Sequence, residues 1–360
     1  MKKVLILTSI KTGSGHKSSA NAIEKKLCDE GYECKQLDVF PLMGSIGELM
    51  ENSYIALTTR TPFLYYLMQK FSQIFPDIIH LYIYLHVKKQ LLKQIKEYDP
   101  DLIISVQCMF TKAISRILRK NELRIPFYVG VIDLVDPPMV WKDPKADMSF
   151  VPTDKIKEDY IAKGFPRDRV LTSGFPVRDD IVVRDKAKDI HNRVHILMVN
   201  TSTDLNKNIR FLKEVSKLEK VSIKFICGLD QRLYDTLTAM QEKGELSKDI
   251  DIYDFVDNMN EFLTHSHIIM TKAGPNVITE AVRSDTAVVI CGHIKGQENH
   301  NYEFIVENGY GFRCEDPDLI YEKLYDFITT SKLTDCLENI VQNEISNGAE
   351  YIARYVKEHI

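Results

Sequence analysis

Residues 271–301 constrain the fold more than any other stretch of this chain. An apolar run at residues 267–270 predicts a short buried strand, and residues 287–291 predict a second one. Between them, a turn containing Gly274 leads into a helix that is predicted from residue 277. A strand, a helix and a second strand in this order form a βαβ unit, which is typical of a parallel sheet.

The turn before this helix is suited to a phosphate group. Pro275 and Asn276 lie near the first turn, where both residue types are favoured. The start of a helix offers unpaired N–H groups and the positive end of a dipole. A second polar loop, residues 292–298, leaves the carboxyl end of the next strand, the edge where open parallel sheets bind ligands. Because many βαβ units with a glycine turn bind nothing, a purely structural turn stays open as the alternative.

The totals indicate a reduced, two-domain protein. A chain of 360 residues is long enough for two domains with a core each. Its formal net charge of −4 gives no reason to expect nucleic acid as a partner. The 7 cysteines are odd in number and scattered without a CxxC pair, which argues against a disulfide framework or a zinc site.

The start of the chain predicts a buried strand at residues 4–9, because its apolar part is too short for a signal peptide. No apolar run approaches the roughly 18 residues of a transmembrane helix. We therefore expect a cytoplasmic protein, which leaves room for peripheral contact with a membrane.

A glycine loop follows the first strand and ends at a histidine. Gly13 and Gly15 precede His16, and a helix is predicted over residues 20–27. The loop lacks the third glycine of the dinucleotide fingerprint, so it does not predict NAD binding. Its glycines let a substrate approach the backbone. A neutral histidine at a helix start is suited to act as a general base, and a histidine that only caps the helix is the alternative.

Residues 42–96 are rich in tyrosine, phenylalanine, leucine and isoleucine and poor in acids. Basic residues are interleaved among them: Arg60, Lys70, Lys88, Lys89, Lys93 and Lys96. Aromatic side chains beside lysines that favour anionic lipid are typical of a protein that rests on a membrane surface. The alternative is a helical hairpin packed on the sheet, with the lysines in solvent.

The order Lys-Ala-Gly-Pro at residues 272–275, Glu280-Ala281, Gly-Gln-Glu at residues 296–298 and Asn308-Gly309 resembles glycosyltransferase family 28. This family contains monogalactosyldiacylglycerol synthases, bacterial diacylglycerol glucosyltransferases and a peptidoglycan-precursor N-acetylglucosaminyltransferase. The resemblance covers nearly the whole chain. It implies an α/β protein with the GT-B fold, in which two Rossmann-like domains face a central cleft.

Four segments are expected from this resemblance and from the charged, apolar-poor stretch at residues 179–191. Residues 1–178 would form an acceptor- and membrane-binding domain, and residues 179–191 a linker. Residues 192–348 would form the nucleotide-sugar domain. A final helix over residues 349–360 would cross back to the first domain.

The resemblance also implies the donor site. The backbone at Phe255 and Val256 would hold uracil, Glu280 the ribose hydroxyls, and Gln297 and Glu298 the sugar. Gly274, Asn276 and Thr279 would lie near the phosphates. Since the start of the helix at Gly274 can stabilise the diphosphate, we expect no metal and no cofactor beyond the UDP-sugar donor.

On the acceptor side, the resemblance assigns the general base to His16, the approach of the acceptor to Gly13 and Gly15, and contact with the acceptor to Trp141, the only tryptophan. A position for Trp141 in the domain core is the alternative. The chain departs from the family at two loops. Pro138 stands near the place of a histidine that relatives often carry, and residues 200–206 contain no glycine where relatives usually have a glycine-rich loop.

The favoured function is inverting transfer of a hexose, glucose or galactose, from a UDP-sugar to diacylglycerol. The β-linked glycolipid would form at the inner face of the cell membrane, with the protein bound peripherally to its anionic surface. Two alternatives stay open: a related transferase with another lipid or secondary-metabolite acceptor, and a protein that binds UDP-sugar without turnover. The sequence carries no signal for an oligomeric state.

Overall fold

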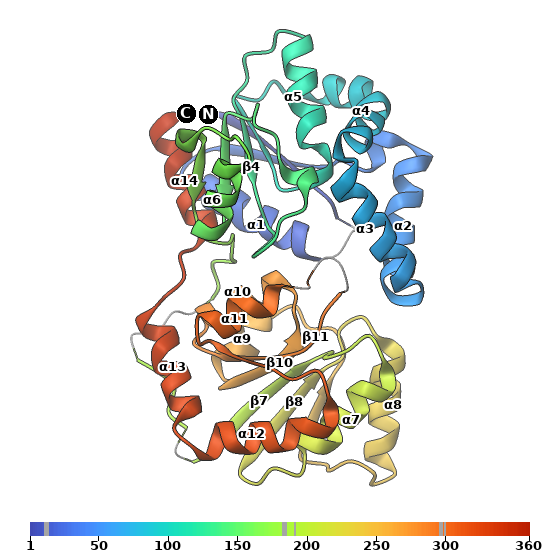
Figure 1. Cartoon of the computed structure of the whole chain (residues 1–360), viewed down its shortest axis with the longest axis vertical. Helices are drawn as coiled ribbons and strands as arrows, with labels where there is room; N and C mark the ends of the chain where they lie inside the picture. The colour runs from blue at the N-terminus through green and yellow to red at the C-terminus, as the bar shows by residue number, and fades with distance from the viewer. Residues whose placement is uncertain (11–13, 182–185, 191, 295–297, 299) are drawn as a thin grey trace. The chain divides into compact units, whose positions relative to one another are not determined.

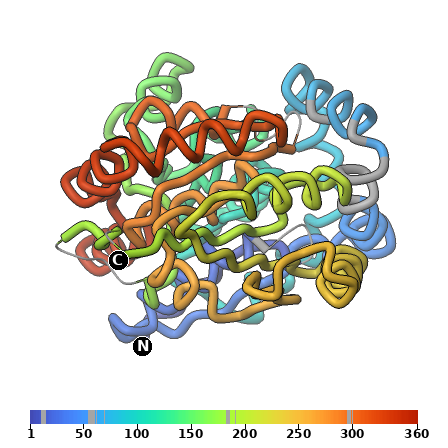
Figure 2. The backbone as a smooth tube through the Cα atoms, turned by 90° about the horizontal axis from the view of Figure 1, so that it is seen from below, coloured from blue at the N-terminus to red at the C-terminus, as the bar shows by residue number. Residues whose placement is uncertain are grey.

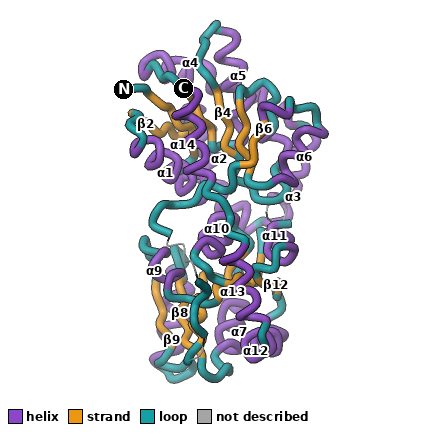
Figure 3. The backbone as a smooth tube through the Cα atoms, turned by 90° about the vertical axis from the view of Figure 1, so that its left-hand side faces the viewer, coloured by secondary structure: helices purple, strands orange, loops and turns teal. Residues whose placement is uncertain are grey.

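The computed structural model describes the chain except residues 11–13, 182–185, 191, 295–297 and 299. It divides into two compact units (Figure 1). The N-terminal unit consists of Met1–Asp179 together with Ser346–Ile360, and the C-terminal unit is Asp180–Ile345. In each unit, helices lie on both sides of the strands (Figure 3). This layering buries both faces of a parallel sheet.

The N-terminal unit contains a six-stranded parallel sheet in the order β2-β1-β3-β4-β5-β6. The strands are β1 (Lys3–Thr8), β2 (Glu33–Asp38), β3 (Leu102–Ser105), β4 (Phe127–Gly130), β5 (Met148–Val151) and β6 (Val170–Thr172). Residues of β3, β4 and β5 are buried throughout, as their continuous apolar runs require. The order reverses between β1 and β3, so this pair marks the switch point at which such sheets bind ligands.

The helices of this unit are α1 (Ser14–Asp29), α2 (Ser45–Arg60), α3 (Pro62–Ile74), α4 (Pro76–Tyr98), α5 (Thr111–Lys120), α6 (Asp154–Ala162) and α14 (Gly348–His359). Proline at the first position of α3 and of α4 separates α2, α3 and α4, because proline starts a helix but cannot continue one. Within the described residues, no helix is long and apolar enough to cross a membrane.

The last helix, α14, returns to the N-terminal unit and packs on α1. Asn347 caps it by accepting from the amide of Ala349 at 3.0 Å, and its side chain also exchanges two hydrogen bonds with the backbone of Val177. Gly174, with a φ of +82°, lets the returning chain come close, since a Cβ there would lie 2.2 Å from the Ser346 carbonyl oxygen. Both ends of the chain lie on this unit (Figure 1, Figure 2).

The C-terminal unit contains a second six-stranded parallel sheet, in the order β12-β11-β10-β7-β8-β9. Its strands are β7 (Val194–Val199), β8 (Val221–Ile226), β9 (Ile250–Tyr253), β10 (Ile268–Lys272), β11 (Ala287–Gly292) and β12 (Gly311–Arg313). This is the strand order of a Rossmann fold, and its switch point lies between β7 and β10. The strands β10 and β11 and the helix between them form the βαβ unit that residues 267–291 predict.

The helices of the C-terminal unit are α7 (Leu205–Val215), α8 (Gln231–Glu242), α9 (Met259–Thr264), α10 (Pro275–Arg283), α11 (Asn301–Glu307), α12 (Ile320–Thr329) and α13 (Lys332–Gln342). Lys188 anchors the beginning of this unit. Its buried ammonium donates to the carbonyl oxygens of Leu263 and Ser266 and to the hydroxyl of Thr286, at 2.6 to 2.8 Å. These three acceptors satisfy a charge that would otherwise be costly to bury.

Candidate functional site

His16 lies at the switch point of the N-terminal sheet. It sits in the first turn of α1, and its Nδ1 lies 2.7 Å from the carbonyl oxygen of Val106. Val106 follows the last residue of β3. Because a carbonyl oxygen only accepts hydrogen bonds, Nδ1 carries the proton, and Nε2 of the neutral ring keeps its lone pair.

Burial lowers the pKa of His16, and the hydrogen bond to Val106 offsets part of that shift. The imidazole is therefore neutral at physiological pH, which is the state that a general base requires. The Nδ1 hydrogen bond joins the ring to the backbone directly after β3, whereas a helix cap would bond an amide of α1. Gly15 precedes His16 in the same turn, and Gly13 lies outside the described residues.

Trp141 lies in the interior of the N-terminal unit. Its side chain is only 1% exposed, and its indole N–H donates to the carboxylate of Asp133. This position agrees with the alternative of a tryptophan in the domain core, and the contact with an acceptor stays a prediction. Asp133 is the half-buried group that this indole orients.

Asp133 follows β4 at the carboxyl edge of the sheet, and no site role was predicted for it from the sequence. Burial raises its pKa to about 6, although the hydrogen bond from Trp141 acts in the opposite direction. A nearby second carboxylate, Asp136, raises the pKa further. In the sequence, the only sign that Asp133 could belong to a functional site was its position at the end of a strand.

In the C-terminal unit, β10 leads into α10 as the phosphate-binding prediction requires. Gly274 is the N-cap residue, and Pro275 and Asn276 form the first turn. The hydroxyl of Thr279 donates to the carbonyl oxygens of Pro275 and Asn276 within α10, and its side chain is 1% exposed. Thr279 therefore stabilises the first turn of the helix, and its single donor is not directed at a phosphate. Glu280 lies on the same helix and is 7% exposed.

The side chains of Glu298 and Asn301, which follow β11, lie beside the start of α10. A carboxylate oxygen of Glu298 lies 3.8 Å from the position that a Cβ of Gly274 would take, and its other oxygen accepts from the amide of Ile294 at 2.8 Å. Asn301 donates to the carbonyl oxygen of Ala273 at 2.8 Å and so ties the two loops together. Gln297, the other predicted sugar ligand, lies outside the described residues.

Lys272, the last residue of β10, places a half-buried ammonium group at this edge. Burial lowers its pKa, and the carboxylates of Glu298 and Asp230 act against that shift. Within the described ranges, its ammonium has no hydrogen bond or ion pair. We did not predict a role for this cation, although its place next to the glycine turn was visible in the sequence.

The predicted uracil-binding residues lie in a loop and not at the end of a strand. Strand β9 ends at Tyr253, so Phe255 and Val256 follow it in the connection to α9. The side chain of Phe255 is 59% exposed. Because this loop lies outside the sheet, its backbone N–H and C=O groups are not all paired with a neighbouring strand. They are therefore accessible for hydrogen bonds with a base.

Exposed apolar side chains gather on α3 and on the first half of α4, and we call this surface the apolar face. It consists of Phe63, Leu64, Leu67, Met68, Phe71, Ile74, Phe75, Ile78, Leu81, Tyr82 and Leu85, each between 43% and 73% exposed. Exposed apolar patches of this kind mark interaction surfaces. The face lies within the segment that was predicted to contact a membrane.

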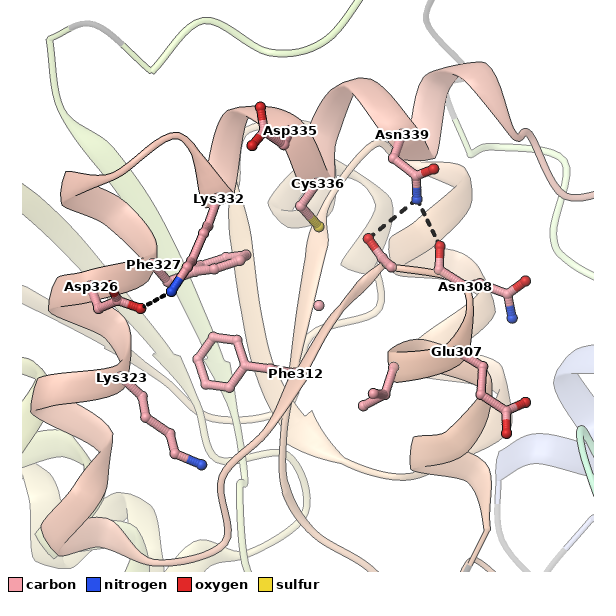
Figure 4. A pocket seen from close by; sticks show the side chains of 13 residues that line it. Glu307, Asn308, Phe312, Lys323, Asp326, Phe327, Lys332, Asp335, Cys336 and Asn339 are labelled. Atoms are coloured by element: carbon pink, nitrogen blue, oxygen red, sulfur yellow. Dashed lines mark hydrogen bonds and ion pairs between the residues drawn. The ribbon is translucent and has the colours of Figure 1, made fainter.

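A hollow of about 770 Å³ lies at the outer edge of the second sheet, between β12, α12 and α13 (Figure 4). The rings of Phe312 and Phe327 and the side chains of Lys323 and Lys332 line it. None of the predicted donor residues contributes to it. Among the residues that the structure describes, no three His, Cys, Asp or Glu side chains are grouped so that they could hold a metal ion.

Two family models match the two parts of the chain. Residues 16–177 match the monogalactosyldiacylglycerol synthase model, and residues 200–353 match the model of the glycosyltransferase family 28 C-terminal domain. The chain belongs to glycosyltransferase family 28. The matched ranges contain His16, α10 and the loop after β11.

Curated relatives are similar over most of the chain. The chloroplastic probable monogalactosyldiacylglycerol synthase of Glycine max is 26% identical over 342 residues, which cover 88% of this chain and 63% of the plant protein. The processive diacylglycerol beta-glucosyltransferase of Bacillus cytotoxicus is 24% identical over 345 residues, which cover 89% of this chain and 84% of the bacterial protein.

Solved structures show that this family 28 protein has the GT-B fold. MurG of Acinetobacter baumannii aligns with a TM-score of 0.68 at 15% identity, over 99% of this chain and 100% of that one. The spinosyn rhamnosyltransferase SpnG aligns with a TM-score of 0.65 at 10% identity, over 99% and 100%. At these identities the likeness concerns the fold alone.

The glycine-free loop of this family 28 protein is held by Asn200 and by Asn208 of α7. Asn200 adopts a φ of +35°, a region that asparagine tolerates better than most residues. The buried side chain of Asn208 accepts from the Thr201 hydroxyl and the Ser202 amide, and it donates to the Ser202 carbonyl oxygen at 2.7 Å. The conformation after β7 is thus fixed by side-chain hydrogen bonds, without glycine.

Proposed function

We propose that this chain transfers a hexose, glucose or galactose, from a UDP-sugar to diacylglycerol with inversion, and so forms a β-linked glycolipid at a membrane surface. The observation that carries the proposal is the tautomer of His16, whose Nδ1–H is held by the Val106 carbonyl oxygen at 2.7 Å while Nε2 stays available. Family 28 membership and relatives named for diacylglycerol glycosylation support the acceptor class.

In the proposed reaction, Nε2 of His16 takes the proton of the acceptor hydroxyl while that oxygen bonds to the anomeric carbon. The bond between this carbon and the diphosphate oxygen breaks, and UDP leaves with the electron pair. Attack from the face opposite the leaving group inverts the anomeric centre, so an α-linked donor gives a β-linked product. A general base of this kind contributes about 10²–10⁴ in rate.

The C-terminal unit would hold the donor. The first turn of α10 and the ammonium of Lys272 offer positive charge to the departing diphosphate. Glu280 would accept hydrogen bonds from the ribose, Gln297 and Glu298 would hold the sugar, and the backbone near Phe255 would contact uracil. In this proposal neither a metal nor a cofactor takes part.

The apolar face supports a peripheral membrane position for this reaction. Side chains such as Phe63 and Ile74, 73% and 65% exposed, would be stabilised by transfer into the acyl boundary of a bilayer. Lysines of the same segment favour an anionic surface. The proposed location is the inner face of the cell membrane, where both UDP-sugar and diacylglycerol are accessible.

Mass spectrometry of the reaction products tests the proposal. The purified protein is incubated with diacylglycerol in anionic vesicles and with UDP-glucose or UDP-galactose, in the presence of EDTA. We expect a hexosyl-diacylglycerol with one of the two donors. The absence of both lipid product and UDP would contradict a transferase and favour a protein that binds UDP-sugar without turnover.

A second candidate is a transferase with another lipid or secondary-metabolite acceptor. Two observations favour it: the glycine-free loop held by Asn208, and Pro138 near the place of the family's histidine. Release of UDP without hexosyl-diacylglycerol in the same assay would select this candidate. A screen of acceptor hydroxyls would then identify the substrate.

A further inference from the structure

Three cations converge on one aromatic ring between α4 and α5. The guanidinium carbon of Arg116 lies 4.4 Å from the ring centroid of Tyr84, and the ammonium groups of Lys88 and Lys120 each lie 5.8 Å from it. Tyr84 and Lys88 belong to α4, and Arg116 and Lys120 belong to α5, which packs against it (Figure 1). The ring attracts each cation through its negative face.

These cations have no carboxylate partner among the described residues, in contrast to their neighbours on the same two helices. On α5, Lys112 pairs with Asp77 at 2.6 Å, and on α4, Lys93 approaches Glu97 at 3.6 Å. Like charges held around one ring repel one another, and an anion placed among them relieves that repulsion. The arrangement therefore favours binding of a small anion.

The cation cluster continues a row of the apolar face. Ile78, Leu81, Leu85 and Lys88 follow one another at spacings of three, four and three residues, which places them on one side of α4. Ile78, Leu81 and Leu85 are 57%, 45% and 52% exposed. From Ile78 to Lys88 the helix rises about 15 Å. When the apolar row enters the acyl boundary, Lys88 lies toward the headgroups.

We propose that Lys88, Arg116 and Lys120 bind the phosphate of an anionic phospholipid headgroup. The planar guanidinium of Arg116, oriented on Tyr84, supplies paired N–H donors to two phosphate oxygens, and the lysines act as point charges. The inference rests on the proposed membrane function and deepens it, because it replaces general attraction to an anionic surface by a defined site. The site selects phosphate-bearing lipid over neutral lipid.

Vesicle flotation tests this site directly and needs no enzyme activity. The wild-type chain is compared with Arg116→Gln/Lys120→Gln on vesicles of phosphatidylcholine alone and with 20 mol% phosphatidylglycerol. We expect the double variant to bind the anionic vesicles at least tenfold more weakly and the neutral vesicles unchanged. Arg116→Lys, which keeps the charge and removes the planar fork, should lose about threefold. Circular dichroism confirms that the variants are folded.

The matched control is Lys89→Gln/Lys96→Gln, which removes the same charge from exposed positions of α4 outside the cluster. Equal losses in the two double variants would overturn the site and leave diffuse attraction, and the proposed function would survive. Failure of the wild-type chain to prefer anionic vesicles would overturn the site and the anionic-membrane part of the proposed function. Binding of inorganic phosphate at the cluster without vesicle binding would overturn the lipid as the ligand.

Discussion

The tautomer of His16 is fixed by a backbone carbonyl oxygen, and this has a consequence for mutagenesis. Val106 presents that oxygen at the end of β3, so no second side chain is needed to orient the imidazole. A variant at this position should therefore affect proton transfer and leave the neighbouring strands intact. The base function can be tested with a single substitution.

We expect His16→Ala to lower transfer by at least 100-fold, because a general base contributes about 10²–10⁴. The affinity for UDP should stay unchanged, since the donor residues belong to the C-terminal unit. Initial rates and calorimetric titration with UDP measure the two quantities. Transfer within about threefold of the wild-type rate would exclude His16 as the base.

Asp133 predicts a dependence of stability on pH. Its pKa is raised from 3.8 to about 6, so the folded chain holds this proton more tightly than the unfolded chain. As the pH rises from 4 toward 6, the ionised carboxylate becomes costly in the folded state and stability falls. Asp133→Asn should stabilise the protein at pH 7.5 by on the order of 1–2 kcal/mol, with a gain that shrinks toward pH 4.

Thermal unfolding at several pH values measures this gain. Asp136→Asn is the control, because Asp136 is exposed and only influences Asp133 at a distance. A gain of the same size at pH 4 and pH 7.5 would show that the carboxylate of Asp133 is not destabilised by burial.

At the scale of elements, the loop after β7 depends on Asn208. Asn208→Ala removes the side chain that satisfies Thr201 and Ser202 and should lower the free energy of unfolding by about 1–3 kcal/mol, since buried polar groups lose their partners. The exposed neighbour Asn206→Ala should change stability by less than about 0.5 kcal/mol. Denaturant unfolding of both variants gives the comparison, and equal effects would contradict a role for Asn208 in the loop.

The apolar face gives a second prediction for an element. Ile74→Ser/Ile78→Ser should weaken binding to neutral vesicles by about tenfold or more, because each side chain loses part of the roughly 1.5–3 kcal/mol that full burial of an isoleucine contributes. Leu229→Ser, at an 88% exposed position in the C-terminal unit, should leave binding unchanged. If both variants bind like the wild-type chain, the apolar face has another partner.

The sequence predicted the elements well where the apolar runs are continuous. The run at residues 287–291 lies within β11, whose residues are all buried, because a strand that is covered on both faces needs a continuous apolar run. Phe255 and Val256, which were predicted to hold uracil, lie beyond the end of β9 at Tyr253, since pairing with β8 ends there. Strand ends depend on the partner strand, which local sequence does not reveal.

The candidate site was predictable in outline and not in its contacts. His16 and Gly274 were recognisable because their motifs join a strand to a helix, where chain direction alone sets their position. Trp141 is buried, and the Thr279 hydroxyl donates to a carbonyl oxygen of its own helix. Both features depend on packing and hydrogen bonds across the unit. No sequence pattern distinguishes such contacts from exposed ones.

For the whole molecule, the division of the chain predicts how its fragments behave. Residues 180–345 form a compact unit with a complete sheet, so this fragment alone should fold and bind UDP. Residues 1–179 alone lack α14, which packs on α1, and should be less stable by several kcal/mol. Circular dichroism of both fragments tests this, and addition of a peptide of residues 346–360 should restore the N-terminal fragment.

The return of α14 also sets an order for biosynthesis. A ribosome makes residues 180–345 before it makes α14. The C-terminal unit can therefore fold before the last helix of the N-terminal unit has been synthesised. During that interval the surface of α1 that α14 covers is exposed, together with the apolar face. Chaperones that recognise exposed apolar segments would meet the nascent chain at this stage, and its capacity to reach a membrane would arise before its fold is complete.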